Sequence, residues 1–282
     1  NYFNSGINML PASCWERQYK LSLNLHDMAI KTAYCVGNFA QLCTLVSTVL
    51  SKGKTLEDIL DAHNSQVRYL TSTGQCEGAI SQCLVVLEEL GEKLPEDLTD
   101  EIEVEYMHVK GLLATRTPND ILQLPFMGED RKLAAMEFLS LIQAACSNTR
   151  PQLGVLAIIR MVKMTLEWGL CDVSAFSFAA YGGFLVSPVN QDFEGSYQYG
   201  KIGLKVLDKF SPKGQNRLVA RVYNMVFGTI NVFREPYQGK ENLYYCLFIV
   251  IETSLTRKPL FVQKHLLIIL KMDTAMAASL PT

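Results

Sequence analysis

The sequence predicts an all-α protein, a tetratricopeptide-like α-solenoid built from antiparallel helix pairs. Three observations support this prediction. One pattern occurs twice between Ser13 and Pro95: a helix, a turn at glycine, and a second helix with apolar residues at fixed offsets. The two turns, at Gly37 and Gly74, are 37 positions apart, close to the ~34-residue period of tetratricopeptide helix pairs. A further turn of the same kind follows at Gly169.

Apolar residues follow the first two turns at offsets of five, nine and twelve. Glycine accepts the left-handed backbone that ends one helix, so the chain can reverse there. Spacings of four and three then place the later positions on one face of the next helix. Because one pair cannot bury such a face alone, pairs stack into a solenoid. The residues at these offsets are Leu42, Val46 and Val49, then Ala79, Cys83 and Val86, and after the third turn Ser174, Phe178 and Tyr181.

Composition narrows the class of protein. The chain has 282 residues, of which 49% are hydrophobic and 19% charged, which indicates a substantial buried core and excludes a disordered protein. The net charge of −2, without a long basic run, argues against nucleic acid as the main partner. The eight cysteines form no CxxC motif, so we interpret them as buried thiols in a reducing, cytoplasmic compartment. Because the chain opens at Asn1 in mid-pattern, we expect a segment of a longer protein.

The N-terminal part divides into two segments. Residues 1–12 are expected to be the end of a preceding repeat or a linker, and residues 13–95 two tetratricopeptide-like helix pairs. Capping-box spacing predicts helix starts at Ser13, with Glu16, and at Thr55, with Asp58. The helices are predicted at about Trp15–Val36, Phe39–Ser51, from Thr55 onward, and Glu77–Leu90.

Residues 96–236 are predicted to add further helix pairs to the same solenoid. They open with an acidic stretch, Glu96 to Glu105, interpreted as a solvated helix start. The connection from Thr117 to Gly128 is apolar, so we expect it to be packed. Glycines near Tyr199 predict close helix approach. The helices are predicted up to Thr115, then at about Asp130–Ser147, Pro151–Trp168, around Phe178, Phe193–Phe210 and Arg217–Phe233.

Residues 237–282 are predicted to be a divergent or truncated helical segment. Their two apolar runs, Leu243–Ile251 and Leu260–Leu270, fall short of the ~20 residues that span a bilayer, so no membrane span is expected. Strand remains an alternative for Tyr244–Ile251, which is aromatic and β-branched.

No motif for phosphate binding, zinc proteolysis or serine hydrolysis occurs, so we expect no catalytic residue, no metal and no cofactor. The four histidines are isolated in sequence and are interpreted as structural: His26, His63, His108 and His265. An aromatic-rich region from Phe176 to Tyr199 is either core or the lining of a ligand groove, to which Tyr223 is added as a candidate. The groove candidates are Phe178, Tyr181, Tyr197, Tyr199 and Tyr223.

Six short segments suggest a family through their order and spacing between Pro11 and Pro236. They are Trp15–Tyr19, Leu87–Pro95, Ile121–Pro125, Ser174–Gly182, Phe193–Gly200 and Arg234–Pro236. Together they resemble the tetratricopeptide-like helical region of large multidomain signalling proteins, which carry an AAA-type ATPase domain with a serine-threonine kinase domain or a sensor histidine kinase. After Pro236 the chain departs from that pattern, and the ATPase and kinase motifs lie outside it.

The resemblance implies a non-enzymatic scaffold or sensor segment. Its concave groove would bind a protein partner or a small effector and relay the change to flanking domains. The alternative is a free-standing helical enzyme or small-ligand-binding protein, with a buried pocket built from histidines and aromatic residues. Two histidines converging with a carboxylate in one pocket would favour the enzyme.

Overall fold

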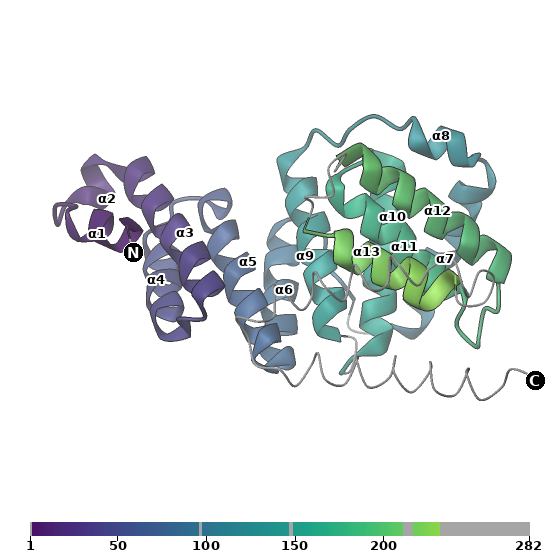
Figure 1. Cartoon of the computed structure of the whole chain (residues 1–282), viewed down its shortest axis with the longest axis horizontal. Helices are drawn as coiled ribbons and strands as arrows, with labels where there is room; N and C mark the ends of the chain where they lie inside the picture. The colour runs from purple at the N-terminus through teal and green to yellow at the C-terminus, as the bar shows by residue number, and fades with distance from the viewer. Residues whose placement is uncertain (1, 96–97, 147–148, 211–216, 232–282) are drawn as a thin grey trace, which may run out of the picture.

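A computed structural model describes residues 2–95, 98–146, 149–210 and 217–231, and these residues form an all-helical protein (Figure 1). Within them the predicted all-α class is confirmed, because the only β-type pairing is an isolated bridge between Phe126 and Leu170. The segment 237–282, including the possible strand at Tyr244–Ile251, lies outside the described residues.

In the described part of the chain, thirteen α-helices are followed by one π-helical turn. Their bounds are α1 Tyr2–Asn8, α2 Cys14–Arg17, α3 Tyr19–Val36, α4 Phe39–Lys52, α5 Leu56–Ser72, α6 Cys76–Glu89, α7 Thr99–Ala114, α8 Pro118–Leu122, α9 Asp130–Cys146, α10 Pro151–Trp168, α11 Asp172–Leu185, α12 Phe193–Phe210, α13 Val219–Met225 and η1 Val226–Ile230.

The first helix departs from its prediction. The chain leaves helical geometry at Gln18, which separates α2 from α3, and the side chain of Ser13 makes no capping hydrogen bond. The continuous helix and its capping box were therefore wrong. Tyr19 is instead tied to the next pair, since its hydroxyl donates to Asp58 at 2.6 Å.

The turns behave as predicted. Gly37 and Gly74 both adopt positive φ, +74° and +80°, the left-handed backbone that favours glycine. At the start of α5, Thr55 and Asp58 form a full capping box. The residues at the predicted offsets after all three glycines are buried, from Leu42 to Tyr181.

Two hydrophobic cores meet at α5. Ala62 belongs to a small core with α3 and α4, whereas Val67, further along the same helix, belongs to a large core that continues to η1. Neighbouring helices then pack in the order α5, α6, α9, α10, α11 and α12. Figure 1 shows the resulting shape, a narrow N-terminal part joined to a broader C-terminal part.

Helices α7 and α8 lie outside this order. Helix α7 packs on α10, and α8 packs on α12, so the chain between α6 and α9 crosses the surface of the larger part. The connection that follows α8 is packed, as expected: Met127 is buried, and its amide donates to the carbonyl of Leu170 at 2.8 Å. A Cβ at Gly169 would come within 2.4 Å of the Pro125 carbonyl oxygen, so this contact requires glycine.

The closest helix contact joins α11 and α12. A Cβ on Gly203 would lie 2.8 Å from the carbonyl oxygen of Ala175, and one on Gly182 would lie 2.8 Å from that of Ser196. Both distances are shorter than real Cβ atoms tolerate, so glycine on each helix allows the backbones to touch. A close approach was expected between Phe193–Phe210 and the helix that follows it, whereas Gly203 makes its close contact with the preceding helix, α11.

A carboxylate whose side chain is 13% exposed joins α5, α9 and the segment before α13. Glu137 on α9 accepts hydrogen bonds from Asn64 and Arg68 on α5, at 3.0 and 2.7 Å, and from Arg217 before α13, at 2.7 Å. Burial opposes its charge, but the two guanidinium groups outweigh burial and lower the pKa of Glu137. Beside them, burial and the neighbouring Arg68 lower the pKa of Arg221 to about 10.

The described cysteines are all free thiols. Cys83, Cys146 and Cys171 are buried, and burial raises the pKa of each thiol, which keeps it protonated. Cys35 and Cys43 are exposed, so the interpretation of uniformly buried thiols was wrong for these two. Among the described helices, none is both long and apolar enough to span a bilayer.

The glycine contact predicts opposite effects for two substitutions. Gly203→Ala should lower the free energy of unfolding by about 1–3 kcal/mol, because its Cβ meets backbone that cannot move aside. Gly111→Ala, on the exposed side of α7 with no atom within 4 Å, should raise it by up to about 1 kcal/mol. Urea unfolding of both variants measures this, and equal stability of the two would contradict the close approach.

Removing the Glu137 carboxylate should take the nearest counter-charge from Arg68 and Arg217, whose side chains are 33% and 50% exposed. Because charge-assisted hydrogen bonds to partly exposed partners are lost, Glu137→Ala is expected to cost about 1–3 kcal/mol of unfolding free energy. Glu103→Ala, at an exposed position on α7, is the control and should change stability by less than about 0.5 kcal/mol. Thermal unfolding of both variants checks this, and a Glu137→Ala melt that coincides with the control would show that the cluster contributes nothing.

Candidate functional site

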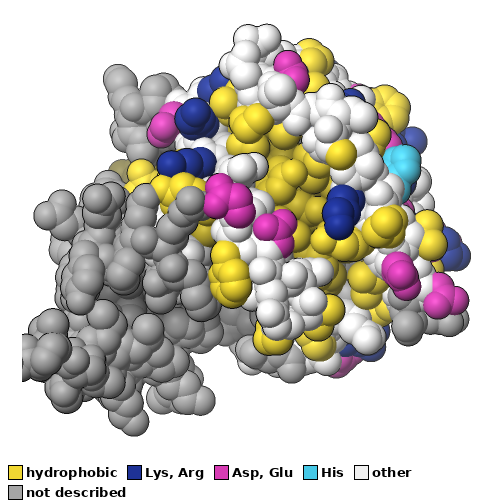
Figure 2. Space-filling view, turned by 90° about the vertical axis from the view of Figure 1, so that its right-hand side faces the viewer, with side chains coloured by type: hydrophobic (Ala, Val, Ile, Leu, Met, Phe, Trp, Pro, Cys, Tyr) yellow, Lys and Arg dark blue, Asp and Glu magenta, His cyan; other side chains and the backbone are white. Residues whose placement is uncertain are grey.

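A cavity of about 350 Å³ opens where the end of α7 faces the end of α11 and the start of α12. Its volume suits a small organic molecule. Figure 2 views the molecule from this side and shows a hollow of hydrophobic side chains, with acidic side chains on one part of its rim and a basic side chain opposite. The lining consists of Tyr106, Lys110, Leu113, Ala114, Tyr181, Leu185, Asp192, Glu194, Gly195, Gln198 and Tyr199.

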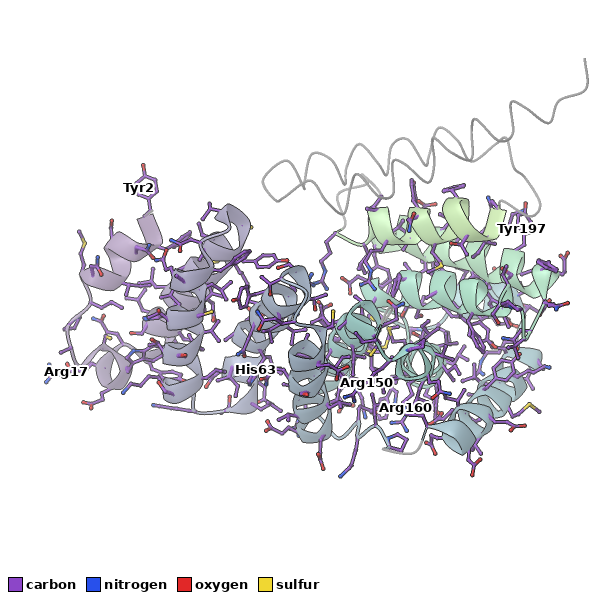
Figure 3. All side chains as sticks on the ribbon, turned by 90° about the horizontal axis from the view of Figure 1, so that it is seen from below. Tyr2, Arg17, His63, Arg150, Arg160 and Tyr197 are labelled. Carbon is purple, nitrogen blue, oxygen red and sulfur yellow. The ribbon has the colours of Figure 1, made fainter. Side chains whose placement is uncertain are left out.

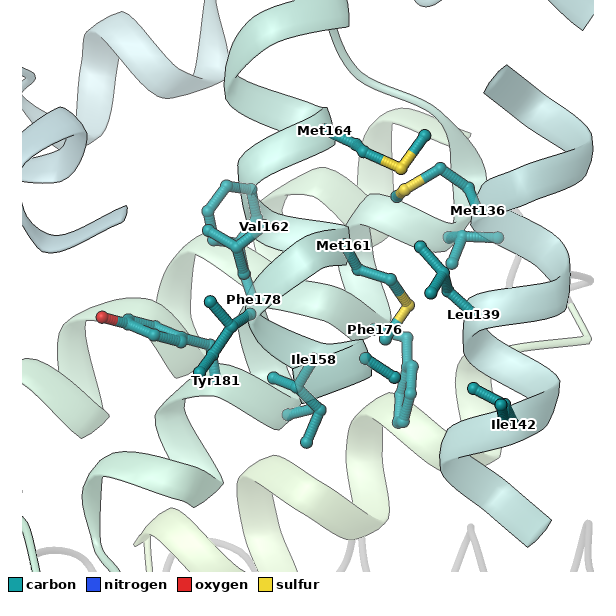
Figure 4. Packing of buried hydrophobic residues seen from close by; sticks show 14 of the residues in the cluster. Met136, Leu139, Ile142, Ile158, Met161, Val162, Met164, Phe176, Phe178 and Tyr181 are labelled. Atoms are coloured by element: carbon teal, nitrogen blue, oxygen red, sulfur yellow. The ribbon is translucent and has the colours of Figure 1, made fainter. Parts of the chain in front are cut away.

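Three tyrosine rings form the walls. The ring centroids of Tyr181 and Tyr199 are 5.1 Å apart in an edge-to-face arrangement, and Tyr106 lies 6.5 Å from Tyr181. Behind them, Phe178 stacks on Tyr199 and Phe184 contacts both other tyrosines. Such pairs hold each ring in one orientation. Figure 4 shows Tyr181 at the edge of the buried cluster, with its hydroxyl pointing away from the apolar side chains.

Ion pairs hold α7 in place over α10. The carboxylate of Glu105 is buried and lies 3.1 Å from the ammonium of Lys163. Arg160 binds Glu101 at 3.1 Å and also donates to the carbonyl oxygen of Lys93 at 2.8 Å. The interpretation of the acidic stretch as solvated was therefore wrong for Glu105. Its buried carboxylate pairs with Arg160 and Lys163 on α10. These contacts fix which face of α7 packs against α10, and in that orientation Tyr106 lies beside Tyr181.

A tight turn places the acidic rim. The amide of Asp192 donates to the carbonyl of Leu185 at 3.0 Å, which closes the loop between α11 and α12. Asp192 then caps α12, since its Oδ1 accepts from the amide of Gly195 at 2.8 Å. A Cβ on Gly195 would lie 2.3 Å from Asp192 Oδ2, so glycine leaves the space that this carboxylate occupies.

The pKa of each tyrosine hydroxyl in the cavity is raised above its ordinary value. Burial is the largest cause that raises the pKa of Tyr106, Tyr181 and Tyr199. The negative charge of Asp192 raises all three further, so its field reaches every hydroxyl in the cavity. At neutral pH each neutral phenol both donates and accepts hydrogen bonds.

Of the five groove candidates, the structure brings two together in the cavity, Tyr181 and Tyr199. Phe178 is fully buried and supports Tyr199 from behind. Tyr197 lies outside the cavity lining under the ammonium of Lys201, 4.1 Å from its ring centroid. Tyr223 packs against Phe227 at 5.4 Å, also outside the lining.

Sequence reasoning missed Tyr106, Lys110 and Asp192. Tyr106 and Lys110 lie some 70 positions or more from the other tyrosines, and no local pattern predicts that α7 returns to them. Asp192 carried a usable signal, because aspartate directly before a predicted helix start at Phe193 is a preferred N-cap.

The described histidines occupy separate places. His26 contacts the Ser22 carbonyl, His63 contacts Gln82, and His108 lies 3.8 Å from Glu167. Figure 3 shows His63 on α5, well away from Tyr197 on α12. None of the three lines the cavity, and among the residues described no cluster of metal-ligating side chains occurs.

Comparison with protein-family models, with curated proteins and with solved structures finds no match for this chain. The resemblance to the tetratricopeptide-like region of ATPase-linked signalling proteins therefore stays a prediction.

The tyrosine cluster predicts a loss of stability at alkaline pH. Since the pKa of Tyr181 is raised on folding, the unfolded chain loses this proton first, and stability falls once pH exceeds about 10. Tyr181→Phe removes this contribution. Between about pH 9 and pH 11 the variant should therefore lose less free energy of unfolding than the wild type, by roughly 1 kcal/mol.

Urea unfolding at both pH values measures this difference. Tyr2→Phe, at a side chain that is 96% exposed, is the control and should follow the wild type. Identical alkaline losses in the wild type and Tyr181→Phe would show that the Tyr181 phenol titrates as in the unfolded chain.

Proposed function

We propose that this chain is a non-enzymatic helical-repeat scaffold, a tetratricopeptide-like solenoid that binds a protein partner or effector and relays binding to flanking domains. The parent would be a cytoplasmic, ATPase-linked signal-transduction protein. The observation that carries the binding role is the cavity between α7, α11 and α12, with its walls of Tyr106, Tyr181 and Tyr199.

Repeat geometry supports the scaffold. The pairs α3–α4 and α5–α6 each reverse at a glycine with positive φ, and their offset positions are buried in the same way. Helix α5 contacts α3 and α4 on one side and α6 and α9 on the other, as a stacked repeat requires. A structure of this kind transmits a local shift through packed neighbours, since each helix contacts the next.

The cavity supports binding of an effector at one end of this stack. Its lining comes from α7, α11 and α12. Packing and ion pairs join α7 to α10, packing joins α11 to α10, and α12 packs on α11. A ligand that draws α7 toward α12 would shift the packing of α7 against α10. Because α10 also packs on α9, the packing of these two helices would shift as well. Ligand binding at the cavity would thus bias the position of α9 against α5 and α6.

A free-standing small-ligand-binding protein is the second candidate, and the tyrosine walls of the same cavity favour it. The two candidates differ in what surrounds the chain in its gene. An ATPase domain encoded upstream of Asn1 would support the scaffold. A start codon just before these helices and a stop codon just after them would support the free-standing protein.

A tryptophan at the mouth of the cavity should block an effector. Ala114 is exposed at the end of α7 and lines the cavity, so Ala114→Trp fills the opening without overpacking the core. A metabolite that stabilises the wild type by about 2.7 kcal/mol at one hundred times its Kd should lose most of that effect in this variant.

The measurement is a thermal-shift screen of small metabolites against the whole chain, repeated on Ala114→Trp and on Ala40→Trp. Ala40 is exposed on α4 and serves as the matched control, which should keep every hit. Hits that persist equally in Ala114→Trp, or a screen without hits on the wild type, would contradict the cavity as the binding site.

A further inference from the structure

We propose that the cavity between α7, α11 and α12 binds a small organic ammonium ion, whose charge faces Asp192 and whose hydrocarbon part lies against Tyr106, Tyr181 and Tyr199. This inference rests on the proposed function, in which the cavity receives an effector, and it names the chemical class of that effector.

The charges around the cavity favour a cation. Among the described residues two carboxylates line it, those of Asp192 and Glu194, against one ammonium group, that of Lys110. In addition, the last turn of α7 lies at the cavity through Leu113 and Ala114 and contributes the negative end of a helix dipole. An anionic ligand would have to approach both carboxylates, whereas a cation meets a single like charge.

The opposing dipole, at the start of α12, is in part satisfied within the chain by the side chain of Asp192. The amide of Gly195 donates to Asp192 Oδ1 at 2.8 Å, and the amide of Ser196 donates to the Asp192 carbonyl at 3.0 Å. These donors therefore have partners within the chain and are not left for an incoming anion. Among the residues described, Asp192 Oδ2 has no hydrogen-bond donor, so this oxygen is the acceptor that an ammonium group can use.

The aromatic walls suit the same class of ligand. Tyrosine faces carry negative charge and attract ammonium groups within about 6 Å of the ring centroid. Lys110 already illustrates this contact, because its ammonium lies 5.9 Å from the centroid of Tyr106. The three hydroxyls, kept neutral by burial and by Asp192, add oxygen acceptors that an N–H donor can reach.

Three probes of similar shape distinguish the effect of ligand charge from the effect of ligand shape: benzylammonium, benzyl alcohol and benzoate. Isothermal titration of the whole chain at neutral pH should show binding of benzylammonium, with the alcohol and the benzoate at least about tenfold weaker, the difference that one close charge pair makes. Equal binding of the alcohol, or preference for benzoate, would overturn the ammonium assignment.

Asp192→Asn is the informative variant, because asparagine keeps the capping oxygen and removes only the charge. It should weaken benzylammonium about tenfold and leave benzyl alcohol unchanged. Asp208→Asn, an exposed position on the same helix outside the cavity, is the matched control and should bind like the wild type. Near-ultraviolet circular dichroism of both variants verifies that the tyrosine packing is intact.

The outcomes separate this inference from the proposed function. If Asp192→Asn binds benzylammonium as tightly as the wild type, the charge of Asp192 is not the determinant and the inference is wrong. If no probe binds but the metabolite screen finds hits that Ala114→Trp abolishes, the ammonium class is wrong while the effector cavity stands. If neither experiment finds a ligand, both proposals fail.

Discussion

The backbone contact between α11 and α12 is the constraint on which the rest of the larger part depends. Gly182 and Gly203 face the opposite helix where a Cβ would lie 2.8 Å from a carbonyl oxygen, and Gly200 faces Ile230 on η1. Helices at this distance exclude side chains between them, so the aromatic residues of both are directed to the edges of the contact. One of those edges is the cavity, where Tyr181 and Tyr199 meet.

Electrostatic contacts extend this arrangement outward. Glu105 pairs with Lys163 beneath α7, and Glu137 pairs with Arg68 and Arg217 between α5, α9 and α13. The carboxylate of Glu105 is buried and that of Glu137 is 13% exposed, so the basic partners hold each carboxylate in one orientation. The cavity therefore lies between rigid elements, which favours selection of a ligand by shape and charge.

Local patterns predicted the helices and the turns well, because glycine at positive φ and apolar spacing act over a few residues. Gly37, Gly74 and Thr55 are examples. The break at Gln18 and the return of Tyr106 to Tyr181 depend on contacts distant in sequence, so no local pattern contains them. For the same reason only part of the cavity could be predicted. Tyr181 and Tyr199 lie in one aromatic-rich segment of the sequence, whereas α7, which completes the cavity, lies far from it in sequence.

The most direct test of the central claim is nuclear magnetic resonance of the chain with ¹³C-labelled tyrosine rings during titration with benzylammonium. Shifts are expected at Tyr106, Tyr181 and Tyr199, assigned by single phenylalanine substitutions, with the exposed Tyr2 unchanged. Unperturbed rings at these three positions, or shifts confined to tyrosines of the N-terminal part such as Tyr69, would contradict an ammonium-binding cavity between α7, α11 and α12.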